Sequence, residues 1–416
     1  MIAAEWLAGE QRKTLSERTG FVVAASVIGL GLFASVTPSP LYRTYSVLWH
    51  FSPVTLTLVY ATYAFGVLTS LLLLGGVSDD VGRRPVLLAG LAALMGSTVL
   101  FMLAGSAAWL YVARGLQGLA TGAALSAASA ALLDLHPRRD PAGVGLTNAL
   151  GAATGLGLGV LVSSAIVEVG TEPRLLPYVV LLTLFAIAFV GVALMPEPVR
   201  TASGFHLRLE RPSVPAGVRR PFVLASLAVI SSWSIGALFF SLGPQLGAEL
   251  FRTTNTVVDG IGIVVLALAA TVAQYLTARV APWLATSLGS LALAGGMALI
   301  VMAAATGSSG LYLMGSVLGG AGFGAAFLGG LRALVGVIPP SHRASVMSAF
   351  YVVAYASLSI PAVLAGFVVT RVGLHDTFEI FGAAVGGLAV VVAFEAWRTR
   401  PVAVVAPGVS EAAAGR

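Results

Sequence analysis

One short segment concentrates residues that could form ion pairs between helices. It reads Gly75-Gly76-Val77-Ser78-Asp79-Asp80-Val81-Gly82-Arg83-Arg84-Pro85, and we call it the charged loop. Its glycines permit a tight reversal of the chain and close approach of helices. Asp79 can face a helix N-terminus, while Arg83 and Arg84 can pair with carboxylates or lipid phosphates. The segment therefore predicts a turn between two helices that is stabilised by ion pairs.

A second group of polar residues lies within an apolar stretch. Arg114, Gln117 and Thr121 fall along one stripe if this stretch is helical. A lone guanidinium in an apolar environment is costly unless it meets a cavity, a carboxylate or carbonyl groups. We expect the stripe to face a central cavity. The alternative is a structural arginine that is satisfied by carbonyl groups and lipid headgroups.

Further polar and aromatic residues in apolar stretches are candidates for lining the same cavity. Two prolines interrupt Thr37-Pro38-Ser39-Pro40-Leu41-Tyr42, and the carbonyls they free must be satisfied by neighbours or by water in a cavity. Asp259 is the best titratable candidate, with a place at the membrane interface as the alternative. The alternative roles for the tyrosines are packing between helices for Tyr351 and Tyr355 and a place in an aromatic belt at the membrane interface for Tyr42. The candidates are Thr37, Ser39, Tyr42, Asn148, Asp259, Tyr351 and Tyr355.

The composition indicates that these residues are surrounded by a bilayer. Of the 416 residues, 57% are hydrophobic and 10% are charged, which leaves too little polar surface for an ordinary soluble protein. The absence of cysteine excludes disulfides, thiolate metal sites and thiol nucleophiles. The net charge of +6 comes from basic residues spread in ones and twos between apolar stretches, so we expect no nucleic-acid partner.

Twelve apolar stretches are long enough to span a bilayer as helices. They lie near residues 21–42, 54–76, 85–104, 107–133, 142–167, 177–195, 222–246, 256–278, 282–305, 310–334, 344–370 and 377–397. We predict an all-α integral membrane protein with two six-helix bundles. The expected divisions are an N-terminal segment 1–20, a first bundle 21–195, a linker 196–221, a second bundle 222–397 and a disordered tail 398–416.

The basic residues also predict the orientation of the chain. If both termini are cytoplasmic, Arg114 lies inside a span and the outside arginines are only Arg43, Arg174, Arg252 and Arg371. Because positive residues resist translocation, this distribution supports an even number of spans.

The halves are similar at an offset of 202 residues, which carries Gly118 and Gly122 onto Gly320 and Gly324. Such an offset favours a duplicated six-helix unit, one of the architectures that transporters use to place a site at the membrane midplane.

These segments resemble a known family. The charged loop resembles the signature G-x-x-x-D-x-x-G-R-[KR] of the major facilitator superfamily, in its usual place between spans 2 and 3. The run that begins at Arg114 is similar to the second motif of that family, R-x-x-Q-G. The resemblance covers residues 21–397 and implies two bundles related by a pseudo-two-fold axis, the fold of that family. It also points to the bacterial drug:proton antiporter type.

The resemblance implies roles for several residues. The gating motif would comprise Gly75, Asp79, Gly82, Arg83, Arg84 and Asp134, with Asp134 paired to Arg83 and the cytoplasmic side held shut in the outward-open state. The alternatives are a basic turn without a gating role and a solvated Asp134. Arg114 would take part in proton coupling or substrate contact. Gly151, Gly155 and Gly159 partly match an antiporter motif, but Leu156 stands in place of its proline, and small residues at this spacing also let helices pack closely.

We therefore predict a secondary active transporter that works by alternating access, with proton-coupled efflux of a small amphiphilic drug or metabolite across a bacterial cytoplasmic membrane. The alternatives are a symporter or uniporter for a small metabolite and a non-transporting membrane sensor. We expect a monomer in the lipid bilayer, a small-molecule substrate and a proton gradient as energy source. We expect no enzymatic activity, no cofactor and no metal, because the five histidines fall between the predicted spans and no phosphate-binding loop is present.

Overall fold

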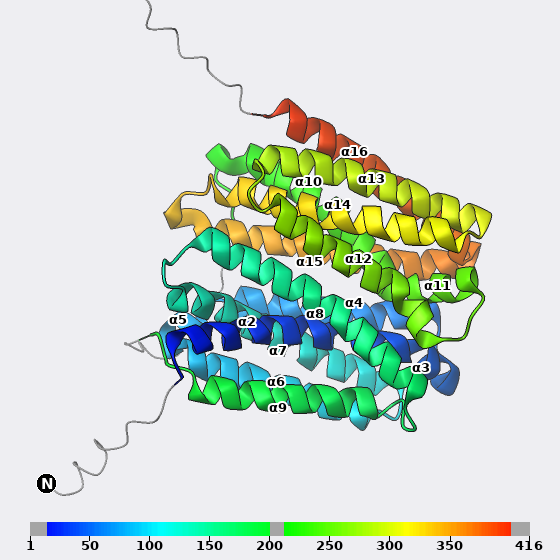
Figure 1. The fold of residues 1–416 in the computed structure, drawn as a ribbon, viewed down its shortest axis with the longest axis horizontal. Helices are drawn as coiled ribbons and strands as arrows, with labels where there is room; N and C mark the ends of the chain where they lie inside the picture. The colour runs from blue at the N-terminus through cyan, green and yellow to red at the C-terminus, as the bar shows by residue number, and fades with distance from the viewer. Residues whose placement is uncertain (1–14, 200–211, 401–416) are drawn as a thin grey trace, which may run out of the picture.

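The computed structural model describes residues 15–199 and 212–400, and every regular element in these ranges is helical. The same ranges contain twelve helical segments that are long and apolar enough to cross a membrane, so the predicted all-α fold with twelve spans is confirmed. In Figure 1 the helices lie side by side along the longest axis, with the first half of the chain below and the second half above. Residues 1–14, 200–211 and 401–416, which belong to the predicted N-terminal segment, linker and tail, lie outside the described residues.

The first six spans are built from nine elements. These are α2 (Glu17–Val36), η1 (Ser39–Leu41), α3 (Tyr42–Trp49), α4 (Pro53–Leu74), α5 (Val77–Val81), α6 (Arg83–Met102), α7 (Ala107–Leu135), α8 (Pro141–Val169) and α9 (Leu176–Leu194). The last six spans comprise η2 (Ala216–Val218), α10 (Arg219–Ser241), α11 (Gly243–Phe251), α12 (Thr256–Thr277), α13 (Pro282–Thr306), α14 (Ser309–Val335), η3 (Pro340–His342), α15 (Arg343–Val372) and α16 (Leu374–Arg398).

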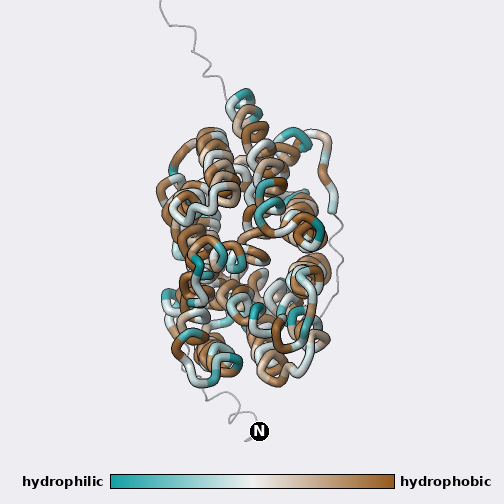
Figure 2. The backbone as a smooth tube through the Cα atoms, turned by 90° about the vertical axis from the view of Figure 1, so that its right-hand side faces the viewer, coloured by the Kyte–Doolittle hydropathy of each residue, from teal (hydrophilic) through white to brown (hydrophobic). Residues whose placement is uncertain are grey.

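Long apolar sequences become helices here because a bilayer offers no water to pair with an exposed backbone. Figure 2, a view along the helices, shows hydrophobic residues all around the molecule. Short polar residues begin several helices. Ser16, Ser52 and Ser308 each accept a hydrogen bond from the backbone N–H three residues later, and Asn255 caps α12 in a similar way.

The first and seventh spans are each broken into two helices, which corrects the predicted ends of these spans near residues 42 and 246. α2 ends at Val36 and the chain continues through η1 into α3, while α10 ends at Ser241 and continues as α11. Prolines lie at both breaks, and their missing N–H groups interrupt the helical hydrogen bonds. Both short helices end at a left-handed residue, His50 with φ 51° and Arg252 with φ 52°. These two residues are separated by the offset of 202 that relates the halves.

Close helix packing repeats at the same offset. A Cβ atom at Gly118 of α7 would collide with the carbonyl oxygen of Tyr63 in α4. A Cβ atom at Gly320 of α14 would collide in the same way with the carbonyl oxygen of Leu266 in α12. The fourth and second spans therefore pack as the tenth and eighth spans do, which supports duplication of a six-helix unit.

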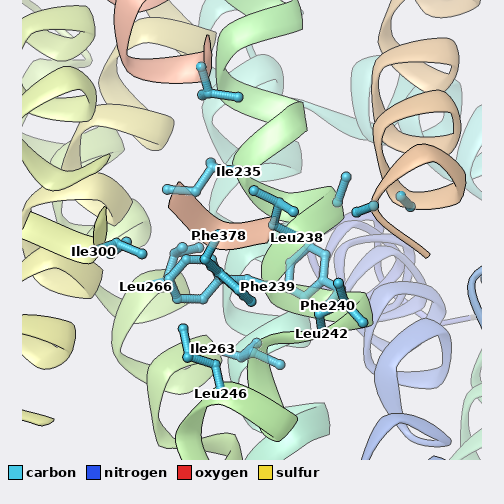
Figure 3. Packing of buried hydrophobic residues seen from close by; sticks show 14 of the residues in the cluster. Ile235, Leu238, Phe239, Phe240, Leu242, Leu246, Ile263, Leu266, Ile300 and Phe378 are labelled. Atoms are coloured by element: carbon cyan, nitrogen blue, oxygen red, sulfur yellow. The ribbon is translucent and has the colours of Figure 1, made fainter. Parts of the chain in front are cut away.

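Contacts between the two bundles are concentrated toward one side of the molecule. We call the side that carries α3 and α11 the α3 side, and the opposite one, which carries α5, the α5 side (right and left in Figure 1). One apolar cluster joins Val36, Tyr60, Ala64 and Val160 of the first half to a larger group around Phe239 in the second. Figure 3 shows the packing around Phe239. Two further clusters, one in each half, extend toward the α5 side without sharing residues.

The glycine contacts give a direct test of this packing. Gly118→Ala should lower the free energy of unfolding by about 1–3 kcal/mol, because the added methyl group overpacks the contact between α7 and α4. Gly387→Ala is the matched control, since a Cβ atom at this exposed position in α16 would meet nothing within 4 Å. Unfolding of purified protein in detergent measures both. Equal stability of the two variants would contradict the close approach of α7 and α4.

Candidate functional site

The guanidinium of Arg114 lies at the break in the first span. Its Nε donates to the hydroxyl oxygen of Tyr42 at 2.7 Å, and one terminal nitrogen donates to the carbonyl oxygen of Ser35 at 2.7 Å. The same nitrogen donates to Oε1 of Gln117 at 2.7 Å, and the amide nitrogen of Gln117 donates to the carbonyl oxygen of Ala34 at 3.0 Å. Arg114 and Gln117 thus supply donors to the last carbonyl groups of α2.

The sequence around Pro38 explains why these donors are needed. In a continuous helix the N–H of residue 38 would bond to the carbonyl oxygen of Ala34, but proline has no N–H. Within a bilayer a free carbonyl group must find another donor. The rings of Tyr42, Tyr63 and Phe101 lie 5.5, 5.5 and 5.7 Å from the guanidinium carbon and further stabilise the charge.

The predicted stripe on α7 is buried in this conformation. Arg114 and Thr121 are fully buried, and Gln117 is 1% exposed. Thr121 lies opposite Gly31 of α2, and its hydroxyl oxygen has no hydrogen-bond partner among the described residues. Arg114 and Gln117 are satisfied by carbonyl groups of α2, and it stays a prediction that the stripe faces a cavity.

The charged loop is held by ion pairs within the first bundle. Arg83 donates from Nε to Asp134 of α7 at 2.9 Å, which is the pairing that the family resemblance implies. It also contacts Asp79 in α5 at 2.5 Å and Ser78 at 2.8 Å. Gly75 accepts a hydrogen bond at its carbonyl oxygen from Ser126 of α7 at 3.0 Å. The loop thereby connects α4, α5, α6 and α7.

Glu197, which the sequence analysis did not single out, binds the N-terminus of α6. Its two carboxylate oxygens accept hydrogen bonds from the backbone N–H groups of Arg83 and Arg84 at 3.0 and 2.8 Å. A carboxylate is favourable there because of the helix dipole. Gly82 must be glycine for two reasons, its φ of 112° and the 2.9 Å that would separate a Cβ atom from Glu197. The sequence feature that could have identified Glu197 is its place directly after the sixth span, in Met195-Pro196-Glu197-Pro198.

An aromatic group lies between the bundles. Tyr355 of α15 packs edge-on against Trp233 of α10, with ring centroids 5.2 Å apart, and is close enough to Tyr60 and Tyr63 of α4 for electrostatic interaction. Tyr351 lies one turn away on the same face, half-buried and in edge contact with Phe350. Tyr351 and Tyr355 therefore lie in one region, on a different helix and in a different bundle from Arg114.

Several buried polar atoms have no hydrogen-bond partner among the described residues. They include Oδ1 of the half-buried Asn148 in α8 and Nε1 of Trp233 in the aromatic group. A buried polar atom without a partner is costly, so such atoms are candidates for contact with water or a substrate.

The remaining polar candidates of the first span are close to the α3 side. The hydroxyl group of Thr37 donates a hydrogen bond to the carbonyl oxygen of Phe33. The carbonyl oxygen of Thr37 accepts one from the hydroxyl group of Ser163 in α8 at 2.6 Å. Ser39 lines a vestibule of about 710 Å³ on the α3 side, between the bundles. Asp259 and Arg43 line the same vestibule. The structure thus places the predicted site residues in the Arg114 cluster, the aromatic group, the charged loop and this vestibule, and Tyr63 connects the first two.

The glycines of the fifth span pack α8 against α2. A Cβ atom at Gly155 would collide with the carbonyl oxygen of Gly29, and one at Gly159 would lie 2.6 Å from that of Phe33. Gly151 has more room, with its nearest backbone atom 3.7 Å away. Gly155 and Gly159 therefore serve helix packing in this conformation.

The described residues contain no group of three or more His, Asp or Glu side chains that could hold a metal ion. One histidine is not in a loop as predicted, because His375 lies in the first turn of α16. Its Nε2 contacts Glu249 of α11 at 2.9 Å and its Nδ1 contacts the carbonyl oxygen of Ala304 at 2.6 Å.

Comparisons with known proteins agree with this architecture. The crystal structure of the human organic anion transporter MFSD10 (TETRAN) is 16% identical over 91% of this chain and 99% of that chain, with a TM-score of 0.67. The xylose transporter XylE from E. coli, in a partially occluded inward-open conformation, is 14% identical over 92% of this chain and 98% of that chain, with a TM-score of 0.74. No curated protein matches the sequence. The family model of the Major Facilitator Superfamily matches residues 19–327, and the chain therefore belongs to this superfamily.

Proposed function

We propose that the protein is a secondary active transporter that exports a small amphiphilic drug or metabolite by alternating access, driven by a proton gradient. Membership of the superfamily and the two six-helix bundles support transport. The predicted alternatives are a symporter or uniporter for a small metabolite and a non-transporting sensor. The proposed setting is a bacterial cytoplasmic membrane, with a monomeric protein and both termini in the cytoplasm.

The observation that carries this proposal is the asymmetry between the two sides. An apolar cluster joins the bundles, while the clusters that extend toward the α5 side each belong to one bundle. Alternating access requires such a state, in which one side is closed and the other can separate. The α5 side is the proposed cytoplasmic side because Arg83, Arg84, Arg138 and Arg139 lie there. The conformation then corresponds to closure toward the outside.

The side chains between the bundles support an amphiphilic substrate with an apolar or aromatic part. Tyr355 and Trp233 offer ring surfaces, and Nε1 of Trp233, which has no partner among the described residues, offers a donor. Ligand sites generally combine apolar walls with a few polar groups of this kind. The first span contains no acid beyond Glu17 at its start, which favours a neutral or anionic substrate at the centre.

Transport by inverted vesicles tests the function directly. Vesicles that contain the protein should accumulate an exported amphiphile when a proton gradient is applied, and an uncoupler should abolish the accumulation. Uptake that follows only the gradient of the solute would indicate a uniporter. No response to any solute by a correctly folded protein would favour the sensor.

We propose that the charged loop controls the α5 side and that Glu197 holds it in shape. Glu197→Gln should lower the transport rate about tenfold, because a hydrogen bond to a charged group contributes about 1.5 kcal/mol. An amide can present only one acceptor to the two N–H donors of Arg83 and Arg84. Rates in reconstituted vesicles, normalised to inserted protein, measure the effect.

Glu395→Gln is the matched control for this variant. Glu395 pairs with Arg398 on the surface of α16, also on the α5 side, so its replacement should leave transport unchanged. Unchanged transport by Glu197→Gln, with normal insertion into the membrane, would contradict the role of the loop.

We propose that Arg114 acts by positioning the broken first span. Arg114→Ala should lower the free energy of unfolding by about 3 kcal/mol, since it leaves buried carbonyl groups without donors. Arg371→Ala, at an exposed position on the α3 side, is the control and should change stability little. Thermal unfolding and the pH dependence of transport are measured on the same preparations. A changed pH profile with full stability would instead indicate a direct role in proton coupling.

A further inference from the structure

An ion pair connects the two bundles on the α3 side. A terminal nitrogen of Arg43 in α3 lies 3.4 Å from Oδ2 of Asp259 in α12. The side chain of Arg43 is 58% exposed, whereas that of Asp259 is only 8% exposed. The carboxylate of Asp259 is thus buried in the protein, and the side chain of Arg43 contacts it from the solvent-exposed side. An ion pair with one exposed partner is weak, so another cation can compete for the carboxylate.

The second oxygen of Asp259 is left without a partner. Oδ1 is buried and makes no hydrogen bond with the described residues, and the same is true of the hydroxyl oxygens of Ser39 and Ser164. Ser39, Ser164 and Asp259 all line the vestibule on the α3 side. Ser164 lies next to Gly260, the residue that follows Asp259, because a Cβ atom at Gly260 would be 3.2 Å from its Oγ. Three unpartnered oxygen atoms among the residues that line one vestibule are costly unless something binds to them.

The other charged groups around Asp259 are acidic. Glu168 of α8 accepts a hydrogen bond from the backbone N–H of Thr256 at 2.7 Å, which ties α8 to the start of α12, and it interacts electrostatically with Asp259. Glu249 of α11 lines the vestibule and contacts His375. Arg43 is therefore the basic residue in contact with Asp259, and His375 is the one in contact with Glu249. The three acids near the vestibule attract positive ions from the adjoining solution.

We propose that Asp259, with Ser164 and Ser39, forms a binding site for a small monovalent cation, either H⁺ or Na⁺, in which Arg43 takes the place of the cation while the α3 side is closed. Binding of the free cation neutralises Asp259 and releases Arg43 to solvent. The ion pair between α3 and α12 is then lost, and the bundles can separate on the α3 side. The site rests on the proposed transport function, for which it would supply the coupling cation.

The energetics require that the cation bind the two states differently. A cation that bound equally well with the α3 side open or closed would shift nothing. Here Arg43 competes with the cation only in the closed state, because only there are α3 and α12 held together. The cation must therefore favour the open state. Without Arg43, the competition disappears and the apparent affinity for the cation rises.

Distances between two spin labels test the site without any transport measurement. The chain has no cysteine, so cysteines introduced at Val169 and Val372 are the only labelling sites. These residues end α8 and α15 on the α3 side, in different bundles, and are 83% and 44% exposed. The distance distribution is measured in nanodiscs against pH at constant Na⁺, and against NaCl at constant pH with choline chloride as the ionic-strength control.

The expected result is a shift toward longer distances as one of the two cations increases. Response to acidification alone identifies H⁺, and response to NaCl alone identifies Na⁺. Asp259→Asn should remove the response and favour the long distances at every condition. Arg43→Gln should flatten the response, because without Arg43 the cation binds the open and the closed state about equally and no longer shifts their populations.

One control variant separates this site from other titrating groups. Glu172→Gln changes an exposed acid on the same side, and it should respond like the parent protein. The proposal is overturned if neither cation changes the distances, if Asp259→Asn retains the response, or if Arg43→Gln leaves the response unchanged. Failure of transport in vesicles with the distance response intact would contradict only the proposed function.

Discussion

A helix that is broken by proline inside a bilayer must obtain new donors for the carbonyl groups it frees, and this requirement organises the first bundle. Arg114 and Gln117 meet it at Ser35 and Ala34. A guanidinium suits this position because it offers several donors in a fixed plane and cannot lose its charge. Its burial is possible only because carbonyl groups, a phenol and aromatic faces surround it. The first span is thus held to α7 at the point where the chain changes direction.

The break in the second bundle is built differently. The seventh span breaks between α10 and α11, where a proline lies in the first turn of α11. Tyr312 of α14, the counterpart of α7, donates to the carbonyl oxygen of Gly243 at 3.4 Å, and its ring stacks on Phe239 at 5.8 Å. The residue that corresponds to Arg114 at the offset of 202 is Ser316, which donates to the carbonyl oxygen of Tyr312 within its own helix. The duplicated units therefore share their architecture but not the charged contact at the broken span.

The sequence predicts the spans well, because each depends on a continuous run of apolar residues that the bilayer forces into a helix. It also predicts the repeat, which appears again in the paired glycines and in the matched left-handed residues His50 and Arg252. The pairing of Arg83 with Asp134 followed from resemblance to the family. The surroundings of Arg114, the role of Glu197 and the partner of Asp259 could not be predicted. Each depends on which helices meet in space, and uniform apolar stretches carry little information about the facing of a helix.

The two sides of the molecule place their charges differently with respect to the bundles. On the α5 side, Arg83 and its partners Asp79 and Asp134 all belong to the first bundle, as does the Glu197 cap of α6. On the α3 side, Arg43 and Asp259 belong to different bundles. The first set keeps all of these contacts when the bundles separate, whereas the second pair is broken by separation. In the proposed mechanism, opening of the α5 side therefore breaks none of these ion pairs. Opening of the α3 side breaks the pair of Arg43 and Asp259, so the charge of Asp259 must then be compensated in another way.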